Sequence, residues 1–257
     1  MFYEIYNTIL FQPLLNLMVW CYNLVGDIGV AIIIVTILVR LVLVPLSVKA
    51  TKSQRALQQL QPEMNKLRQQ HKDNKEEQTK ALMEFYKKNK INPASSCLPM
   101  LVQLPIIFAL YRVFRVGMNA ESMDKLYSFV SQPETVNHFF INLVDMTEPN
   151  LILAVLAGIF QFLQSRMMMP KGANKKKSAK GQGIAADMSS MMTKQMTYFL
   201  PVMTVFIAMS LPSGLALYWA TTTLFALGQQ YLIIKWWKPE NKEEKGAGGK
   251  KSATPAK

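Results

Sequence analysis

The sequence contains few of the residues that build chemical active sites. Only two histidines, His71 and His138, and two cysteines, Cys21 and Cys97, occur among 257 residues. A protein metal site needs several such ligands at close spacing, and these four residues are scattered. A glycine-rich phosphate-binding loop is also lacking. We therefore expect a protein that is not an enzyme and that uses no cofactor.

The sequence also lacks the signals of export and of disulfide bonding. Met1 to Val25 has no basic start, contains Glu4 and is followed by no small-residue cleavage site, so no cleavable signal peptide is expected. The two cysteines are far apart in sequence, and we expect them near opposite membrane faces. A disulfide between them is therefore not expected.

Acidic residues are missing from every long apolar stretch. Half of the residues are hydrophobic, and these residues gather in blocks. A transmembrane helix takes about 20 apolar residues. The blocks at 28–48, 97–116, 151–169, 196–210 and 215–236 therefore predict an all-α membrane protein with five transmembrane helices.

The segments between these blocks have distinct compositions. Residues 49–96 are polar, and Leu57, Leu60, Met64 and Leu67 recur at helical spacing, which predicts a two-helix hairpin outside the membrane. Residues 1–27 mix aromatic and polar side chains, which favours an interfacial helix, although a sixth span is an alternative. Residues 117–150 form an acidic loop, whereas 170–195 are a basic loop and 237–257 a basic tail, both expected to be disordered.

Basic residues are concentrated on one side of this arrangement. The net charge is +13, and 25 of the 29 Lys and Arg residues lie in the hairpin, the basic loop, the tail and their flanks. Cytoplasmic segments of membrane proteins carry such an excess of positive charge. We therefore place the hairpin, the basic loop and the C-terminus in the cytoplasm, and the N-terminus and the acidic loop outside.

One charge lies inside the first apolar block. Arg40 is a little past the middle of residues 28–48, and Thr36 and Ser47 fall on the same helical face. An arginine at mid-membrane costs roughly 2.5–3.5 kcal/mol on insertion scales. Its side chain either reaches the headgroups, pairs with a structural carboxylate, or lies in a water-filled cavity between helices whose function needs a fixed positive charge. No predicted span offers a carboxylate, so the third interpretation gains weight.

Other polar residues lie within the predicted spans. Gln103 lies well inside the second span, and Trp219, Thr223 and Gln230 share one face of the last span. A further row consists of Thr193, Thr197 and Thr204. Each alone is explained by hydrogen bonds between helices. Together with Arg40 they predict a hydrophilic groove, and a channel or small-solute transporter is the alternative function.

Three stretches resemble the YidC-type membrane protein insertases. VTILVRLVLVPLSVKATKSQ (residues 35–54) resembles their arginine-bearing first core span, and INPASSCLPMLVQLPIIFALYRVF (residues 91–114) their second. LPSGLALYWATTTLFALGQQYLI (residues 211–233) is similar to their last span. The resemblance covers about residues 29–236, and the chain looks like a minimal five-span member without a large extracytoplasmic domain.

The resemblance implies a function and a location. A groove open to the cytoplasm and to lipid would admit nascent membrane proteins and release them into the bilayer of the bacterial inner membrane. Arg40 would be the groove arginine, Thr36 and Trp219 would face the substrate, and Gln103 would line the groove. The implied partners are the ribosome, the Sec translocon and the signal-recognition pathway. We further expect substrate to leave between the first and last spans.

Overall fold

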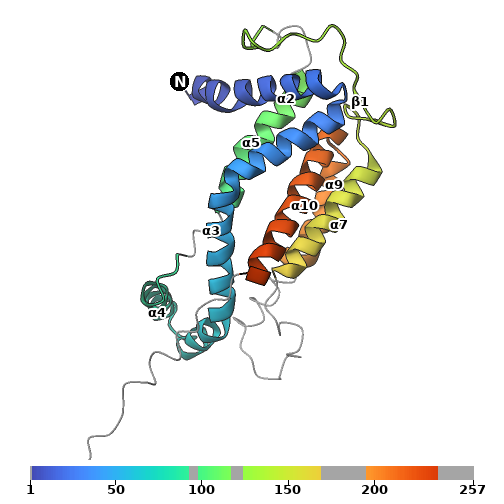
Figure 1. Cartoon of the computed structure of the whole chain (residues 1–257). Helices are drawn as coiled ribbons and strands as arrows, with labels where there is room; N and C mark the ends of the chain where they lie inside the picture. Colours follow the sequence, from blue (N-terminus) through green and yellow to red (C-terminus); the bar gives the residue numbers. More distant parts are fainter. Residues whose placement is uncertain (1, 93–97, 117–123, 169–194, 237–257) are drawn as a thin grey trace, which may run out of the picture.

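The computed structural model describes residues 2–92, 98–116, 124–168 and 195–236, and most of these residues are helical. The predicted basic loop up to residue 194 and the predicted tail lie outside these ranges, as do Thr193 and Cys97. Three consecutive helical segments, α1 (Phe2–Tyr6), η1 (Asn7–Phe11) and α2 (Gln12–Val25), form one N-terminal helix. Gly26 ends it in the left-handed conformation (φ 71°), which glycine adopts without steric cost. Figure 1 shows this helix lying across one end of the other helices.

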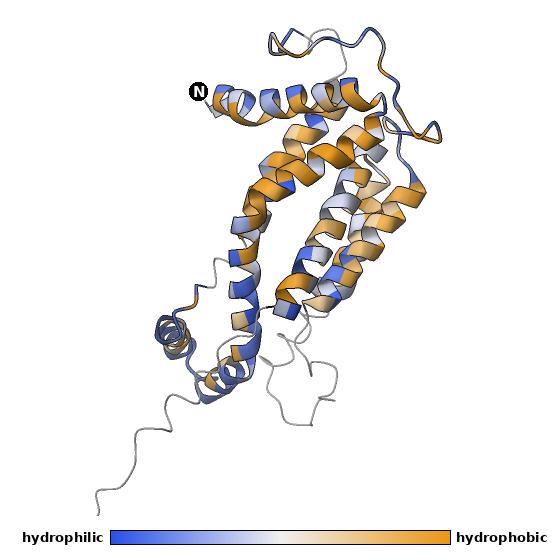
Figure 2. Ribbon diagram, in the orientation of Figure 1, coloured by the Kyte–Doolittle hydropathy of each residue, from blue (hydrophilic) through white to orange (hydrophobic). Residues whose placement is uncertain are grey.

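Helix α3 (Ile28–Gln70) is continuous over 43 residues, so the predicted first span and first hairpin arm form a single helix. Asp27 caps its start by accepting a hydrogen bond from the amide of Val30 (2.9 Å). Pro45 and Pro62 lie within it, and Figure 1 shows that α3 bends along its length. Its colour changes from orange to blue in Figure 2, because the side chains turn from apolar to polar partway along.

Helix α4 (Lys75–Lys88) follows α3 after a short turn and lies beside its polar end (Figure 1). The side chain of Asn74 caps α4 by accepting hydrogen bonds from the amides of Glu76 and Glu77. Met64, one of the four residues that predicted a packing seam, is buried. These two helical arms form the hairpin.

Four further helical elements complete a bundle with the first half of α3. They are α5 (Leu98–Val116), α7 (Leu151–Met167), the π-helical η3 (Gln195–Phe199) continuing into α9 (Leu200–Ala208), and α10 (Ser213–Trp236). Helix α10 packs extensively against both α7 and α3, and α9 packs against α7. Helix α5 touches α3 and α10 more sparsely. The core includes Ile32 and Val35 of α3, Leu110 of α5 and Leu215 of α10.

The segment between α5 and α7 contains a small antiparallel sheet, where the sequence predicted only a loop. Strand β1 (Phe139–Phe140) pairs with β2 (Val144–Asp145), so that Phe140 lies opposite Val144. The same segment reaches the N-terminal helix, because Asn16 accepts a hydrogen bond from the amide of Tyr127 (2.6 Å). The segment therefore ties the N-terminal helix to the end of the bundle.

The described helices differ in their ability to cross a membrane. Two of them, Tyr3–Val25 and Ile28–Gln70, are long and apolar enough to do so. Three shorter apolar helices cover Leu101–Phe114, Leu151–Met167 and Thr197–Ala208. By length and composition alone, two helices of the described ranges could span a membrane, which does not confirm the five predicted spans.

Candidate functional site

Arg40 lies where three helices meet. Its Nη2 donates a hydrogen bond to Oε1 of Gln103 on α5 (3.0 Å), and its Nε donates a longer one to Oγ1 of Thr222 on α10 (3.4 Å). Gln103 in turn donates through Nε2 to the hydroxyl of Tyr218, also on α10. We call Arg40, Gln103, Tyr218 and Thr222 the Arg40 cluster.

The cluster is polar, and its two residues on α10 are almost fully buried. Tyr218 is 3% exposed and Thr222 6% exposed, whereas Arg40 and Gln103 are half-buried. The partners that hydrogen-bond to the guanidinium are uncharged, and no carboxylate of the described ranges forms an ion pair with it. Arg40 is thus held in place by neutral groups, and its positive charge is not cancelled.

The other predicted site residues have different surroundings. Thr36 and Thr223 are buried, and each hydroxyl donates to a carbonyl of its own helix, that of Ile32 (2.6 Å) and that of Trp219 (2.8 Å). Trp219 is half-buried and Gln230 is buried. The structure therefore joins Arg40 and Gln103 directly, while none of the four other residues hydrogen-bonds to Arg40.

Sequence reasoning missed two members of the cluster. Thr222 and Tyr218 each lie one position before a residue of the predicted Trp219–Thr223–Gln230 row, and they are four residues apart. They share one helical face that is rotated by about 100° from the predicted one. Their spacing was the available signal, but the sequence does not show which face of α10 is turned toward Arg40.

A second polar contact joins α3 and α10 further along both helices. Ser47 and Gln229 exchange hydrogen bonds, in which Nε2 of Gln229 donates to Oγ of Ser47 (2.8 Å) and Ser47 donates to Oε1 of Gln229 (3.1 Å). Beyond it, Gln58 of α3 donates to the carbonyl of Met168 at the end of α7. The predicted polar face of α3 thus contacts α10 at Arg40 and again at Ser47.

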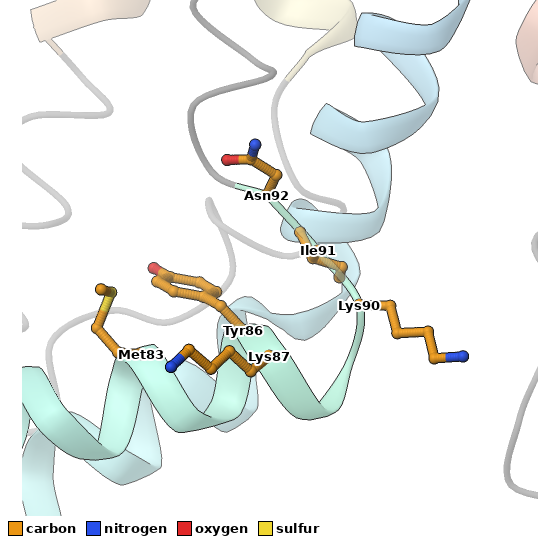
Figure 3. A pocket seen from close by; sticks show the side chains of 6 residues that line it. All are labelled: Met83, Tyr86, Lys87, Lys90, Ile91 and Asn92. Carbon is orange, nitrogen blue, oxygen red and sulfur yellow. The ribbon is translucent and has the colours of Figure 1, made fainter.

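A separate recess lies in the hairpin. It measures about 390 Å³ and is lined by Met83, Tyr86, Lys87, Lys90, Ile91 and Asn92. Figure 3 shows Lys87 turned toward Tyr86 and Lys90 turned away from the recess. The recess shares no residue with the Arg40 cluster. Within the described ranges no group of three or more His, Cys, Asp or Glu side chains could hold a metal ion.

Comparison with known proteins agrees with this architecture. The model of the family described as "60Kd inner membrane protein" matches residues 20–242. A membrane protein insertase YidC of Fusobacterium nucleatum is 37% identical over 211 residues, which are 82% of this chain and 88% of that protein. A membrane protein insertase YidC of Francisella tularensis subsp. novicida is 35% identical over 86% of this chain, which spans 35% of that longer protein.

A solved structure shows the same relationship. The structure described as "Active YidC insertase crystal structure with the first transmembrane domain resolved" superposes with a TM-score of 0.53 and 25% identity. It covers 91% of this chain, which in turn spans 47% of the crystallised chain. With the family match over most of the sequence, these relatives confirm the resemblance found in the sequence. The chain belongs to the 60Kd inner membrane protein family, whose curated relatives are YidC membrane protein insertases.

Proposed function

We propose that this protein inserts nascent membrane proteins into the bilayer through a hydrophilic groove that contains Arg40. The observation that carries the proposal is the Arg40 cluster, in which a positive charge lies among apolar helices and its hydrogen-bond partners among the described residues are neutral. Its relatives are insertases, and nothing in the cluster favours the channel or transporter alternative. The proposed substrates are chains with an apolar segment and a short polar, often acidic, end.

The proposed step is a transfer of the polar end past a shortened apolar barrier. Arg40 attracts an acidic group, and this attraction exceeds that at a solvated surface because the surroundings screen charge poorly. The apolar segment then moves into lipid, driven by burial worth about 25 cal/mol per Å². The protein supplies position and charge, and no bond is made or broken.

We place the five spans in the first half of α3, in α5, in α7, in η3 with α9, and in α10. Although the N-terminal helix is long and apolar enough to cross a membrane, it lies across the end of this bundle in Figure 1, which supports an interfacial position rather than a sixth span. Thr36, Trp219, Thr223 and Gln230 remain proposed groove residues.

The packing of the helices supports a different exit for the substrate from the one between α3 and α10, because these two helices pack extensively, whereas α5 makes sparser contacts with both. We therefore propose release beside α5.

The partners follow from the charged regions. The hairpin of α3 and α4 would meet the substrate first in the cytoplasm. The basic tail and basic loop would bind ribosomal RNA or anionic lipid, which is an interaction that weakens as salt rises. Contacts with the Sec translocon and the signal-recognition pathway belong to the same proposal. The proposed location is the bacterial inner membrane, with the N-terminus outside and the C-terminus in the cytoplasm.

The test is insertion by the purified protein in liposomes. A single-span substrate with an acidic end should insert with the native protein, fail with Arg40→Ala, and insert in part with Arg40→Lys, which keeps the charge but loses the planar donor group. A substrate with a neutral end should depend less on Arg40. Full insertion of the acidic substrate by Arg40→Ala would refute the mechanism, and an ion flux in the same liposomes would favour the channel alternative.

A further inference from the structure

The turn between β1 and β2 exposes apolar side chains. Ile141 is 60% exposed and Leu143 is 81% exposed, although the surrounding segment is rich in acidic and polar residues. An exposed tip made of large aliphatic side chains is unusual in water and marks an interaction site. We call residues 139–145 the β-hairpin.

The backbone of this turn has a fixed and uncommon conformation. Ile141 and Asn142 both have positive φ angles, 51° and 56°, and the amide of Leu143 donates to the carbonyl of Phe140 (3.0 Å). Glycine and asparagine are the usual residues with positive φ, and a β-branched residue there is an outlier. The turn therefore keeps an isoleucine at a position where its backbone is disfavoured, which points to a role for the side chain.

The β-hairpin is also fixed against the start of α3. One oxygen of Asp27 accepts a hydrogen bond from the amide of Ile141 (2.6 Å), while the other caps α3 at Val30 (2.9 Å). Phe140 fills the space beside Gly29, where an added Cβ atom would lie 2.2 Å from its ring. The orientation of the tip is thus set by the first turn of α3.

The exposed apolar surface continues onto the neighbouring helix. Leu151 and Ile152 in the first turn of α7 are 59% and 68% exposed. The connection between the β-hairpin and α7 is fixed, because the main-chain carbonyl of Glu148 accepts a hydrogen bond from the amide of Ser213 (2.9 Å). Figure 1 shows β1 at the same end of the molecule as the start of α7, and Figure 2 shows apolar colouring on both. With α7 placed as a span, as proposed above, its exposed apolar face is turned toward lipid.

We propose that the tip of the β-hairpin inserts Ile141 and Leu143 into the adjacent leaflet of the bilayer, at the boundary between headgroups and acyl chains. The ligand is phospholipid, and the acidic residues of the segment stay in water. Both the contact with lipid, through α7 as a span, and the assignment to the outer leaflet rest on the proposed function. The β-hairpin would then hold the outer end of α3 at a fixed depth.

The test places an environment-sensitive fluorophore at the tip. Leu143→Cys is labelled with NBD in a chain carrying Cys21→Ser and Cys97→Ser, and the protein is reconstituted with phospholipids bearing a nitroxide near the start of an acyl chain. Ile152→Cys on α7 is the lipid reference, and Glu134→Cys, an exposed residue of the same segment, is the water reference. The label at Leu143 should lose fluorescence and shift to the blue as the label at Ile152 does.

The opposite result overturns the proposal. If the Leu143 label matches the Glu134 label, the tip lies in water or needs another protein as its partner. Because Leu143 is exposed, labelling it leaves the packing of the protein unchanged, and Ile141→Cys provides a second reading of the same tip. Adding Arg40→Ala to the Leu143→Cys chain separates the two proposals, since it should abolish insertion of the acidic substrate and leave the quenching as it was.

Discussion

The guanidinium of Arg40 donates two hydrogen bonds to neutral groups, and no carboxylate among the described residues neutralises its charge. The side-chain oxygen of Gln103 accepts one donor of the guanidinium, and that of Thr222 accepts another. Two unit charges 4 Å apart attract by about 1 kcal/mol in bulk water and by about 4 kcal/mol at an effective dielectric constant of 20. A half-buried, uncancelled cation is therefore suited to attract an acidic group that arrives from outside the protein.

Gln103→Glu tests this reasoning at a single residue. The substitution keeps the shape of the side chain and adds a carboxylate within hydrogen-bond distance of Arg40, so that the charge gains an internal partner. We expect insertion of the acidic substrate to fall toward the level of Arg40→Ala, while the folded protein remains intact. Insertion in liposomes and thermal unfolding in detergent measure the two effects.

Gln103→Met is the matched control, since it has a similar size and adds no charge. It leaves a donor of Arg40 without its partner, which costs about 1–3 kcal/mol of stability. Insertion of the acidic substrate should nevertheless continue. If Gln103→Glu inserts as well as the native protein, the free charge of Arg40 is not what the substrate uses.

Residues on a single helix could be grouped from the sequence, but contacts between helices could not be assigned. Arg40 and Gln103 each stood out because a polar side chain within an apolar run requires a partner. Thr36 and Thr223 stood out for the same reason, yet each hydroxyl is satisfied by a carbonyl one turn earlier in its own helix. Threonine can always use this local acceptor, whereas arginine cannot, so a threonine row is a weaker signal.

At the scale of elements, the contact between β1 and α3 depends on a glycine. An added Cβ at Gly29 would meet the ring of Phe140, so Gly29→Ala should displace the β-hairpin and destabilise the protein by about 1–3 kcal/mol. Gly228→Ala on α10 is the control, because nothing lies within 4 Å of its added methyl group. Alanine there should stabilise by about 0.5–1 kcal/mol. Equal unfolding temperatures for the two variants would contradict this packing.

A second prediction concerns the attachment of the N-terminal helix to α5. Arg112 donates to Oδ1 of Asn7 (2.5 Å) and to the hydroxyl of Tyr3 (2.7 Å), and its guanidinium carbon lies 4.4 Å from the centre of the Phe11 ring. Arg112→Ala should lower stability by about 1.5–3 kcal/mol and make residues 2–25 easier to cleave by protease. Arg112→Lys should retain only part of the stability and protease resistance that Arg112→Ala loses, because an ammonium group lacks the planar set of donors. Unchanged protease resistance in Arg112→Ala would show that the helix is held by its apolar contacts alone.

The elements show where reading a sequence by composition succeeds and where it misleads. The change from apolar to charged residues near residue 49 marks the predicted end of the first span, but α3 continues through it because no residue there ends a helix. Pro45 and Pro62 bend such a helix without ending it when neighbouring groups satisfy the freed carbonyls. The β-hairpin escaped prediction because strands of two residues carry no periodicity, and its turn has isoleucine rather than glycine.

At the scale of the whole molecule, charge and shape agree on an orientation. Figure 1 places the hairpin of α3 and α4 at one end and the segment with β1 at the other. Residues 49–96 contain 11 Lys and Arg residues, whereas residues 124–150 at the opposite end contain four Asp and Glu residues and one Lys. Membrane proteins retain their basic segments in the cytoplasm, so the hairpin should be inside and β1 outside.

Labelling in intact cells tests this orientation. Asp73 in the turn between α3 and α4 and Glu134 near β1 are both exposed, so each can be replaced by cysteine in a chain carrying Cys21→Ser and Cys97→Ser. A membrane-impermeant maleimide should label Glu134→Cys in intact cells and Asp73→Cys only after the membrane is opened. Both sites are exposed, so labelling of each variant in detergent is the reference, and the labelling in cells relative to that reference reports the side of the membrane. Labelling of Asp73→Cys in intact cells would show that the protein has the opposite orientation. A groove open to the hairpin side could then not receive chains from the ribosome.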